Sequence, residues 1–384
     1  MVASHGRSLL WIGLTLGLAS GCGANGGAAR PEPTASALPS TPRAAESAAP
    51  SASATRSERK PVPHEVLADQ PHDSCGGVAV RGKDLYYATG KGIWRVPTQG
   101  GKPESLFEGH TEDFVVGDAG LFVAQTGEAG RIARVESGVA TQIGPPLAWP
   151  RALALVGSSI VFTQSGDSRD GDGQAIQSLA RLPQKGGKDA KVEILFEGPK
   201  GFGGFHHLAT DGKTLYFMGS DAGIVKGDVV FGTPSRTVLY RLRAGDAQPE
   251  VIGIDDQPSP SAKSGPIVLV GNTVYWLSSS NVYRTAADAP GVAIDEDGKW
   301  RIAHFDRERV GVSDGPFVPV GADLYRVLRG VGAAFTLVSH PNEEFDELLE
   351  GAWSGACADE ARVYWTYQES DVCHVASRAI GAPR

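Results

Sequence analysis

The sequence contains no apolar run long enough to span a membrane. Its longest run, from Leu9 to Leu18, covers about ten residues, whereas a spanning helix needs about 20. An excess of basic residues is also missing, because 36 Lys and Arg stand against 44 Asp and Glu, for a net charge of -8. This balance argues against a nucleic-acid backbone as partner. The Gly-X-Y period of collagen is absent, and 41% apolar residues exclude disorder throughout the chain.

Two complete catalytic motifs are missing as well. The chain has no His-Glu-x-x-His pair of metal ligands, and no Gly-x-x-x-x-Gly-Lys loop completed by Ser or Thr to hold a phosphate. Turn-forming residues, by contrast, are abundant. With 50 Gly and 25 Pro, these two types make up about a fifth of the 384 residues. Long helices are therefore disfavoured, and a turn-rich fold is predicted.

The N-terminal segment predicts export. Arg7 precedes the apolar run and small residues follow it, which is the pattern of a secretory signal peptide over residues 1–21. The end of this segment, Ala19-Ser20-Gly21-Cys22, resembles the lipobox of bacterial lipoproteins, which implies that Cys22 is acylated and becomes the new N-terminus. Ordinary cleavage near Ala19, with Cys22 as a free thiol, is the alternative. Gly23 lacks the Asp that resembles an inner-membrane retention signal, so the outer membrane is favoured.

Residues 22–61 are predicted to be the lipidated cysteine and a disordered tether. From Gly23 to Lys60 the sequence is mainly Ala, Ser, Pro, Thr and Gly, with no aromatic residue, and Leu38 is its one aliphatic residue larger than Ala. Such a segment cannot bury enough apolar surface to fold. A flexible chain of about 38 residues reaches roughly 35 Å, so the domain predicted over residues 62–384 stands away from the bilayer.

A repeated unit runs from residue 62 to the end of the chain. Each unit has an apolar first strand, a turn that contains Gly, Asp or Asn, an aromatic second strand, and a third strand, which has a basic centre in most units. The second strands begin at Leu85-Tyr86-Tyr87, Leu121-Phe122-Val123, Ile160-Val161-Phe162, Leu215-Tyr216-Phe217, Val274-Tyr275-Trp276, Leu324-Tyr325-Arg326 and Val363-Tyr364-Trp365.

The spacing of these units, from 36 to 59 residues, predicts an all-β fold and a seven-bladed β-propeller. Six blades are the alternative if the irregular sixth unit, near Phe335-Thr336-Leu337-Val338, is an insertion. The last unit stops after its third strand, whereas His64-Glu65-Val66-Leu67 is an unassigned strand ahead of the first unit. We therefore expect the N- and C-terminal strands to pair and to complete one blade, which leaves no open sheet edge in the ring.

At Val363-Tyr364-Trp365-Thr366 the repeat resembles the YWTD and NHL-like group of propellers, and the resemblance covers roughly residues 62 to 384. It implies that the aromatic residues pack one blade against the next. No copy carries the final Asp of that motif, so a receptor-like specificity is not carried over. Arginines at the centres of five third strands are interpreted as salt-bridged framework positions: Arg95, Arg134, Arg181, Arg241 and Arg284.

Candidate binding residues lie where the first strands begin, at the axial mouth of the predicted propeller. Alignment of the units on their turns places these residues near that rim: Glu112, Asp113, Arg151, His206 and His207, with Cys75 and Ser354 close by. Histidines and carboxylates from different blades suit a divalent metal, and gluconolactonase-like propellers are similar in holding a metal at this end. A wet channel lined by polar residues is the simpler interpretation.

With Cys22 assigned to lipid, the remaining cysteines, Cys75, Cys357 and Cys373, predict one disulfide and one free thiol in an oxidising compartment. Cys357 and Cys373 lie in the first and third strands of one blade, roughly 9 to 10 Å apart, which is too far for a disulfide unless a loop bends. A bond from Cys75 to either residue would lock the ring at its closure. The residues themselves do not rank these pairings.

These features favour a monomeric, lipid-anchored protein of the cell envelope that binds or scaffolds an envelope protein or a glycan, without enzymatic activity or cofactor. The enlarged loops predicted over residues 165–177 and 219–237 suit partner recognition. The alternative is a metal-dependent hydrolase or lactonase whose site lies at the axial mouth and holds a divalent metal. Neither hypothesis includes a nucleic-acid partner.

Overall fold

A computed structural model of the chain describes residues 65–71, 73–126, 129–169, 175–198, 202–221, 224–225, 228–229, 236–255, 264–278, 281–294, 307–312, 317–320, 323–327, 335–337 and 352–379. The signal peptide, Cys22 and the tether lie outside these ranges. All regular structure within them is β-strand. The described part of the chain contains no helix long and apolar enough to cross a membrane.

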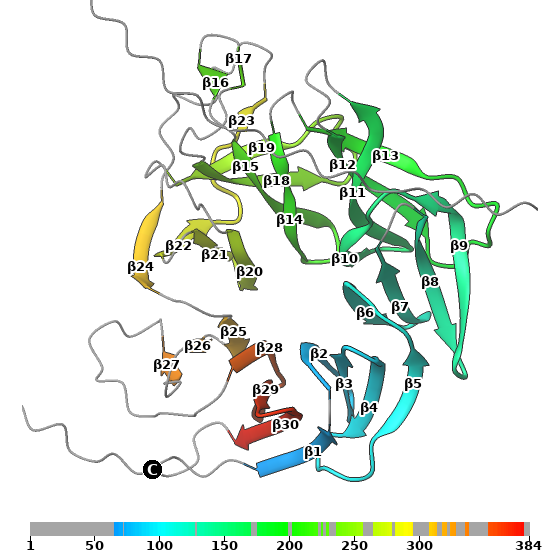
Figure 1. The fold of residues 1–384 in the computed structure, drawn as a ribbon. Helices are drawn as coiled ribbons and strands as arrows, with labels where there is room; N and C mark the ends of the chain where they lie inside the picture. Colours follow the sequence, from blue (N-terminus) through cyan, green and yellow to red (C-terminus); the bar gives the residue numbers. More distant parts are fainter. Residues whose placement is uncertain are drawn as a thin grey trace, which may run out of the picture. The chain divides into compact units, whose positions relative to one another are not determined.

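The first three blades are four-stranded antiparallel sheets whose strands follow in chain order (Figure 1). Blade 1 consists of β2 (Cys75–Arg81), β3 (Asp84–Thr89), β4 (Gly92–Pro97) and β5 (Glu104–Glu108). Blade 2 consists of β6 (Asp113–Gly117), β7 (Gly120–Gln125), β8 (Gly130–Glu136) and β9 (Val139–Leu147). Blade 3 consists of β10 (Arg151–Val156), β11 (Ser159–Arg169), β12 (Ala175–Pro183) and β13 (Glu193–Glu197).

Blades 4 and 5 depart from this plan in their outer strands. Blade 4 has five strands, β14 (Phe202–Thr210), β15 (Thr214–Asp221), β18 (Arg236–Arg243), β19 (Glu250–Ile254) and β23 (Val292–Ala293). Blade 5 consists of β20 (Ser264–Val270), β21 (Thr273–Ser278), β22 (Asn281–Ala286) and β24 (Glu308–Val312). A separate hairpin of β16 (Ile224–Val225) and β17 (Asp228–Val229) follows β15.

The sixth sheet has three described strands, β25 (Phe317–Val320), β26 (Asp323–Val327) and β27 (Phe335–Leu337), and is the irregular sixth unit of the sequence. The closing blade consists of β28 (Ala352–Ala358), β29 (Arg362–Glu369), β30 (Val372–Ala379) and β1 (Glu65–Pro71). In this blade β1 pairs antiparallel with β30, from Glu65 opposite Ser377 to Pro71 opposite Val372, as Figure 1 shows. The predicted closure by the two ends of the repeat domain is therefore confirmed.

The first strands of successive sheets contact one another in a closed series: β2, β6, β10, β14, β20, β25, β28 and β2 again. The all-β propeller predicted from the repeat is thus confirmed. Among the described residues, six of the sheets in this ring have four or five strands. The remaining sheet, β25 to β27, has three described strands and lies between β20 and β28. Residues 57–384 belong to one compact unit.

The core lies between blades, and the aromatic second strands supply much of it. The third residue of the second-strand motif is completely buried in six units and is aromatic in five of them: Tyr87, Val123, Phe162, Phe217, Trp276 and Trp365. Tight turns precede these strands, and Gly82, Gly157 and Gly271 adopt φ values of 55 to 59°, a left-handed region that glycine enters without steric cost. Local turn chemistry thus sets the register. Tyr87, Phe162, Phe217 and Trp276 each pack against the preceding blade of the ring.

The third-strand arginines form the predicted framework of salt bridges. Arg95 pairs with Glu104 and Arg181 with Glu193, each at 2.6 Å. The remaining pairs are Arg134 with Glu136, Arg241 with Glu250, and Arg284 with Glu308. Arg241 differs from the others because its side chain is 2% exposed and also donates to the carbonyl of Ala287 at 2.6 Å. The other four pairs are open to solvent, and ion pairs of that kind contribute little to stability.

The prediction of long loops in blades 3 and 4 was partly wrong. Strands β11 and β12 continue as a hairpin past residue 165, with Arg169 opposite Ala175. Similarly, β15 and β18 stay paired out to Asp221 and Arg236, and the hairpin of β16 and β17 lies within residues 219–237. Backbone N–H and C=O groups in these segments pair in the extended ladders. The glycine-rich and charged composition of the segments had instead predicted loops.

Candidate functional site

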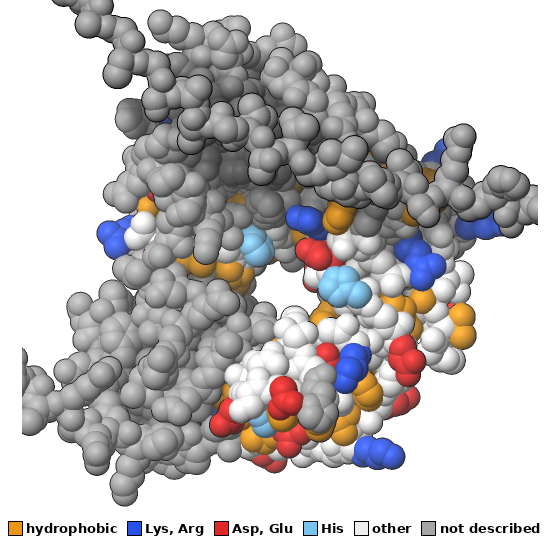
Figure 2. Space-filling model, in the orientation of Figure 1, with side chains coloured by type: hydrophobic (Ala, Val, Ile, Leu, Met, Phe, Trp, Pro, Cys, Tyr) orange, Lys and Arg blue, Asp and Glu red, His pale blue; other side chains and the backbone are white. Residues whose placement is uncertain are grey.

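The predicted mouth residues lie at the end of the ring where the first strands begin. Glu112 precedes β6, Asp113 opens β6, and Arg151 opens β10, so residues from blades 2 and 3 come together there. Figure 2 shows histidine, acidic and basic side chains around a central opening on the viewed face. The site is therefore polar and charged at its rim.

Asp113 joins blade 2 to blade 3 through its carboxylate. Its Oδ1 accepts a hydrogen bond from the N–H of Phe114 at 2.8 Å, and its Oδ2 accepts one from the N–H of Leu153 in β10 at 2.6 Å. Burial raises the pKa of Asp113 to about 6, against the opposing effect of the two N–H donors, and the charge of Glu112 adds to the rise. Both carboxylate oxygens accept hydrogen bonds from backbone N–H groups, so this residue holds the first strands of blades 2 and 3 together.

Glu112 and Arg151 form a second link between the same blades. The Nε atom of Arg151 lies 3.8 Å from Oε1 of Glu112, and the two side chains are 49% and 39% exposed. A pair this open to solvent contributes little to stability. Its charges face water at the rim, where they are available to a polar ligand.

The turn that leads into β10 carries an exposed tryptophan on an unusual backbone. Trp149 is 44% exposed and has φ of 51°, and Ala152 has φ of 41° beside a β-bulge between Arg151 and Leu153. Such values are costly for residues other than glycine, by about 1–3 kcal/mol each. Pro150 packs closely against blade 2, since a Cβ on Gly130 would lie 2.5 Å from its Cδ. The turn is thus held in a strained form that presents the indole ring to solvent.

His206 and His207 lie in β14 of blade 4, at a β-bulge between His206 and Leu208. His207 is exposed and has φ of 49°. The side chain of His206 lies outside the described part of the structure. Strand β10 contacts both β6 and β14, so a blade stands between these histidines and the acidic pair of blade 2. Within the described residues no three His, Cys, Asp or Glu side chains form a group suited to a metal, and the metal site stays a prediction.

Sequence reasoning missed a buried polar network between blades 4 and 5. Asp255 follows β19 and is 1% exposed, and its carboxylate accepts hydrogen bonds from Ser278 Oγ at 2.6 Å and from the Tyr283 hydroxyl at 3.0 Å. Arg307 lies 3.7 Å from the same carboxylate and 4.6 Å above the Tyr283 ring. Asp255 resembles Asp113 in lying on a crossover between blades. The feature of the sequence that could have predicted this network is an acidic residue directly after the outer strand of a blade.

The structure joins Cys75 of β2 to Cys373 of β30 in a disulfide, with Cα atoms 5.1 Å apart. This is one of the pairings that the sequence left open, and it links blade 1 to the closing blade. Cys357 is the free thiol, and burial raises its pKa. A buried thiol with a raised pKa is a poor nucleophile. Ser354 lies in β28, and its side chain lies outside the described residues.

Two short sequence matches to catalytic motifs have the wrong structural surroundings. Gly77 to Lys83 has the glycine and lysine spacing of a phosphate loop but is followed by Asp84, and it forms strand β2 and its turn into β3. Gly311-Val312-Ser313-Asp314-Gly315 has the spacing of a nucleophile elbow, yet its first two residues end the outer strand β24. A phosphate loop and an elbow both need a strand that turns into a helix.

No known family model matches the chain, and no curated protein matches its sequence. Solved structures with the same kind of fold include the computationally designed Ika8 protein, with TM-score 0.51 and 9% identity over 82% of this chain and 98% of that one. The Cps50 (Swd1) β-propeller domain of Myceliophteria thermophila gives TM-score 0.53 and 10% identity over 82% and 100%. The extracellular domain of a putative one-component system from B. thetaiotaomicron gives TM-score 0.53 and 10% identity over 82% and 39%. These likenesses show the β-propeller fold.

Proposed function

We propose that the chain is a lipid-anchored protein of the cell envelope whose propeller binds a glycan at the axial mouth without transforming it. The observation that carries this proposal is the exposed Trp149 on its strained turn beside the Glu112–Arg151 ion pair. An enzyme would need a reactive group at the same end. Among the described candidates there, Asp113, Glu112 and Arg151 are engaged in links between blades.

The chemistry of the rim suits a sugar. An indole ring has a broad apolar face against which the C–H face of a sugar ring can pack, and it loses little conformational entropy on binding. Arg151 presents donors and Glu112 presents acceptors, which match pairs of neighbouring hydroxyls. Strain retained at Trp149 and Ala152 supports a functional role for the turn, because an unstrained sequence would be more stable. Protein recognition at this rim is the competing outcome.

The metal-dependent hydrolase or lactonase remains the second candidate, with His206, His207, Glu112 and Asp113 as its residues. Binding without chemistry is favoured because both oxygens of Asp113 already accept hydrogen bonds from backbone N–H groups, and Glu112 faces Arg151. A metal at this place would have to displace these contacts. Release of the Leu153 N–H would leave a donor in the blade junction without its partner.

The anchor at Cys22 and the outer-membrane location rest on the sequence of residues 1–61. The disulfide between Cys75 and Cys373 fits this part of the proposal, because such bonds persist in oxidising compartments. We expect labelled palmitate to be incorporated into the wild-type protein and not into Cys22→Ala. The anchor is wrong if the wild-type protein carries no label, or if Cys22→Ala stays in the membrane fraction.

Binding at the mouth is tested with the full-length protein in detergent and purified envelope polysaccharide. Trp149→Ala is expected to weaken binding about tenfold or more, as loss of a central aromatic anchor does. Ile194→Ala is the matched control, since Ile194 is an equally exposed apolar residue on the outer strand β13. Equal binding by Trp149→Ala and wild type would refute the glycan site. A stoichiometric divalent metal in the purified protein would instead favour the hydrolase.

A further inference from the structure

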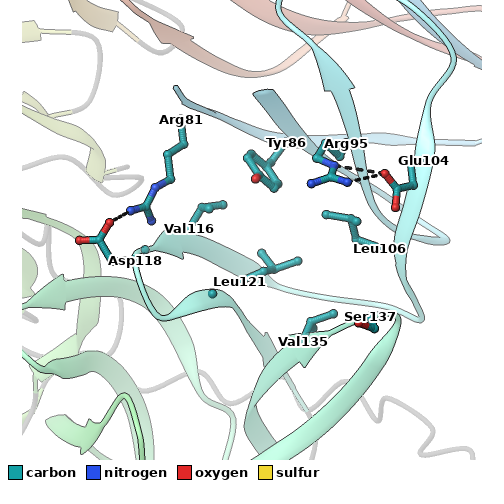
Figure 3. Close-up of a pocket in the computed structure, with 12 residues that line it drawn as sticks. Arg81, Tyr86, Arg95, Glu104, Leu106, Val116, Asp118, Leu121, Val135 and Ser137 are labelled. Carbon is teal, nitrogen blue, oxygen red and sulfur yellow. Dashed lines mark hydrogen bonds and ion pairs between the residues drawn. The ribbon is translucent and has the colours of Figure 1, made fainter. Parts of the chain in front are cut away.

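A second candidate site lies at the opposite end of the strands from the mouth, between blades 1 and 2. A cavity of about 500 Å³ opens there, bounded by the last residue of β2, the first residue of β5 and the turn from β6 to β7. This volume lies in the range of pockets that hold small molecules. Figure 3 shows the side chains that line it.

The floor of this cavity is apolar. Leu121 and Val135 of blade 2 are 5% and 7% exposed and belong to the core cluster between the two blades, while Leu106 and Val116 pack against that cluster. Leu106 and Val116 are only half-buried, so an apolar ligand body that covered them would remove more apolar surface from water.

Arg95 and Arg81 both line the cavity, with Tyr86 between them in Figure 3, but their environments differ. Arg95 is the framework arginine of blade 1, and its Nε and Nη2 atoms donate to Glu104 Oε2 at 3.2 and 2.6 Å. Arg81 pairs through Nη2 with Asp118, whose side chain is completely exposed to solvent. The Nη1 atom of Arg81 is buried and has no hydrogen-bond partner among the described residues. Arg81 therefore has a free donor, and its one acidic partner is weakly held.

Arg81 also departs from the repeat. The other first strands end on small or apolar residues at this position: Gly117, Val156, Thr210, Val270, Val320 and Ala358. Gly117 of blade 2 lies close to this guanidinium, since a Cβ placed on it would be in ordinary contact with Arg81 Nη1 at 3.8 Å, although it would clash with Leu155 Cδ1 at 2.2 Å. If a basic residue at the end of the first strand were part of the framework, every blade would carry one. Among the described first strands only β2 of blade 1 does.

We infer that this cavity binds a small organic acid, with the carboxylate on Arg81 and an apolar body over Leu106, Val116 and Leu121. A guanidinium can give two parallel hydrogen bonds to one carboxylate, which an ammonium cannot. A carboxylate that bridged Nη1 and Nη2 would satisfy the buried donor and replace the solvent-exposed Asp118. This site is separate from the mouth, and its occupation does not depend on glycan binding.

Isothermal titration of the full-length protein with hexanoate tests the inference, with hexanol as the neutral probe of equal chain length. We expect hexanoate to bind with millimolar or tighter affinity and hexanol to bind at least about tenfold more weakly, because the charge-assisted contact is lost. Arg81→Gln should lose hexanoate binding by a similar factor. Arg181→Gln is the matched control, since it removes a framework arginine from blade 3, and it should bind hexanoate as wild type does.

Asp118→Asn keeps the inference falsifiable if Arg81→Gln fails to fold. Asp118 is fully exposed, so its replacement leaves the core intact, and removal of its competing charge should tighten hexanoate binding severalfold. Equal affinity for hexanoate and hexanol would reduce the site to an apolar cavity and overturn the inference. So would unchanged or weaker hexanoate binding by Asp118→Asn, or the absence of any hexanoate binding at about 10 mM.

Discussion

Two junctions between blades of this propeller are filled in different ways. Between blades 3 and 4, four aromatic rings pack together, with Phe217 stacked on Tyr240 at 4.9 Å and Phe205 at the edge of Phe217 at 5.4 Å. Phe196 from β13 completes the group, 5.5 Å from Phe205. Between blades 1 and 2 the corresponding core is largely aliphatic, and a cavity of about 500 Å³ opens at one end, with Arg81 on its side.

The difference shows how one repeat supplies both framework and site. Large aromatic side chains fill the space between two twisted sheets and exclude water. Smaller Leu and Val side chains leave part of that space open, and an arginine at the end of β2 gives it a charge. The fold tolerates the open junction because the ring is held elsewhere by the aromatic group, by Asp113 and by the disulfide.

The largest effect is expected in the aromatic junction. Phe217→Ala should lower the free energy of unfolding by about 3–5 kcal/mol, because it leaves a cavity among rings that cannot collapse into it. Leu106→Ala is the control at the open junction and should cost about 1 kcal/mol, since its side chain already borders open space. Urea denaturation measures both values. Equal losses would show that the two junctions are packed alike.

The junction between the closing blade and blade 1 differs from the other two because a disulfide, Cys75–Cys373, crosses it. Removal of the disulfide in Cys75→Ser with Cys373→Ser should cost about 2–5 kcal/mol, because the bond joins residues 298 positions apart and restricts the unfolded chain. Thermal unfolding with and without reductant measures this effect. Reductant should lower the melting temperature of the wild type and leave that of the double variant unchanged. A wild type that is insensitive to reductant would contradict the assigned pairing.

A smaller effect is expected from Asp113 at the junction of blades 2 and 3. Its folded pKa of about 6 lies above its ordinary value of 3.8, so the folded state binds more protons than the unfolded state between these pH values. This group therefore contributes more stability below pH 4 and loses that contribution as pH rises through 6. Relative to Asp113→Asn, the wild type should gain about 2 kcal/mol as pH falls from 7 to 4.

Urea denaturation of both proteins at each pH isolates this contribution, because all other carboxylates titrate in both. A constant stability difference between wild type and Asp113→Asn over that range would show that the carboxylate is not desolvated. The link to Leu153 would then be a surface contact, and the junction of blades 2 and 3 would be open like that of blades 1 and 2.

The site was only partly predictable. Alignment on the turns placed Glu112, Asp113 and Arg151 at one end of adjoining strands, and the structure brings them together. It did not show that Asp113 bonds the backbone of β10, because that contact depends on the angle between two sheets. Arg81 was missed for a similar reason. In sequence it is a charged residue before a turn, and only the space between the blades makes its Nη1 a buried donor.

Local alternation, glycine at left-handed turns and a repeat that lacks one strand at its end were sufficient to predict the inner strands of the blades, the places of the turns and the closure by β1. Which cysteines meet, which carboxylate joins two blades and where a junction stays open depend on the packing of the sheets. Cys75 and Cys373 are 298 residues apart and come within bonding distance only when the ring closes. Such contacts depend on how sheets pack against one another, and the period of two along a strand carries no information about that packing.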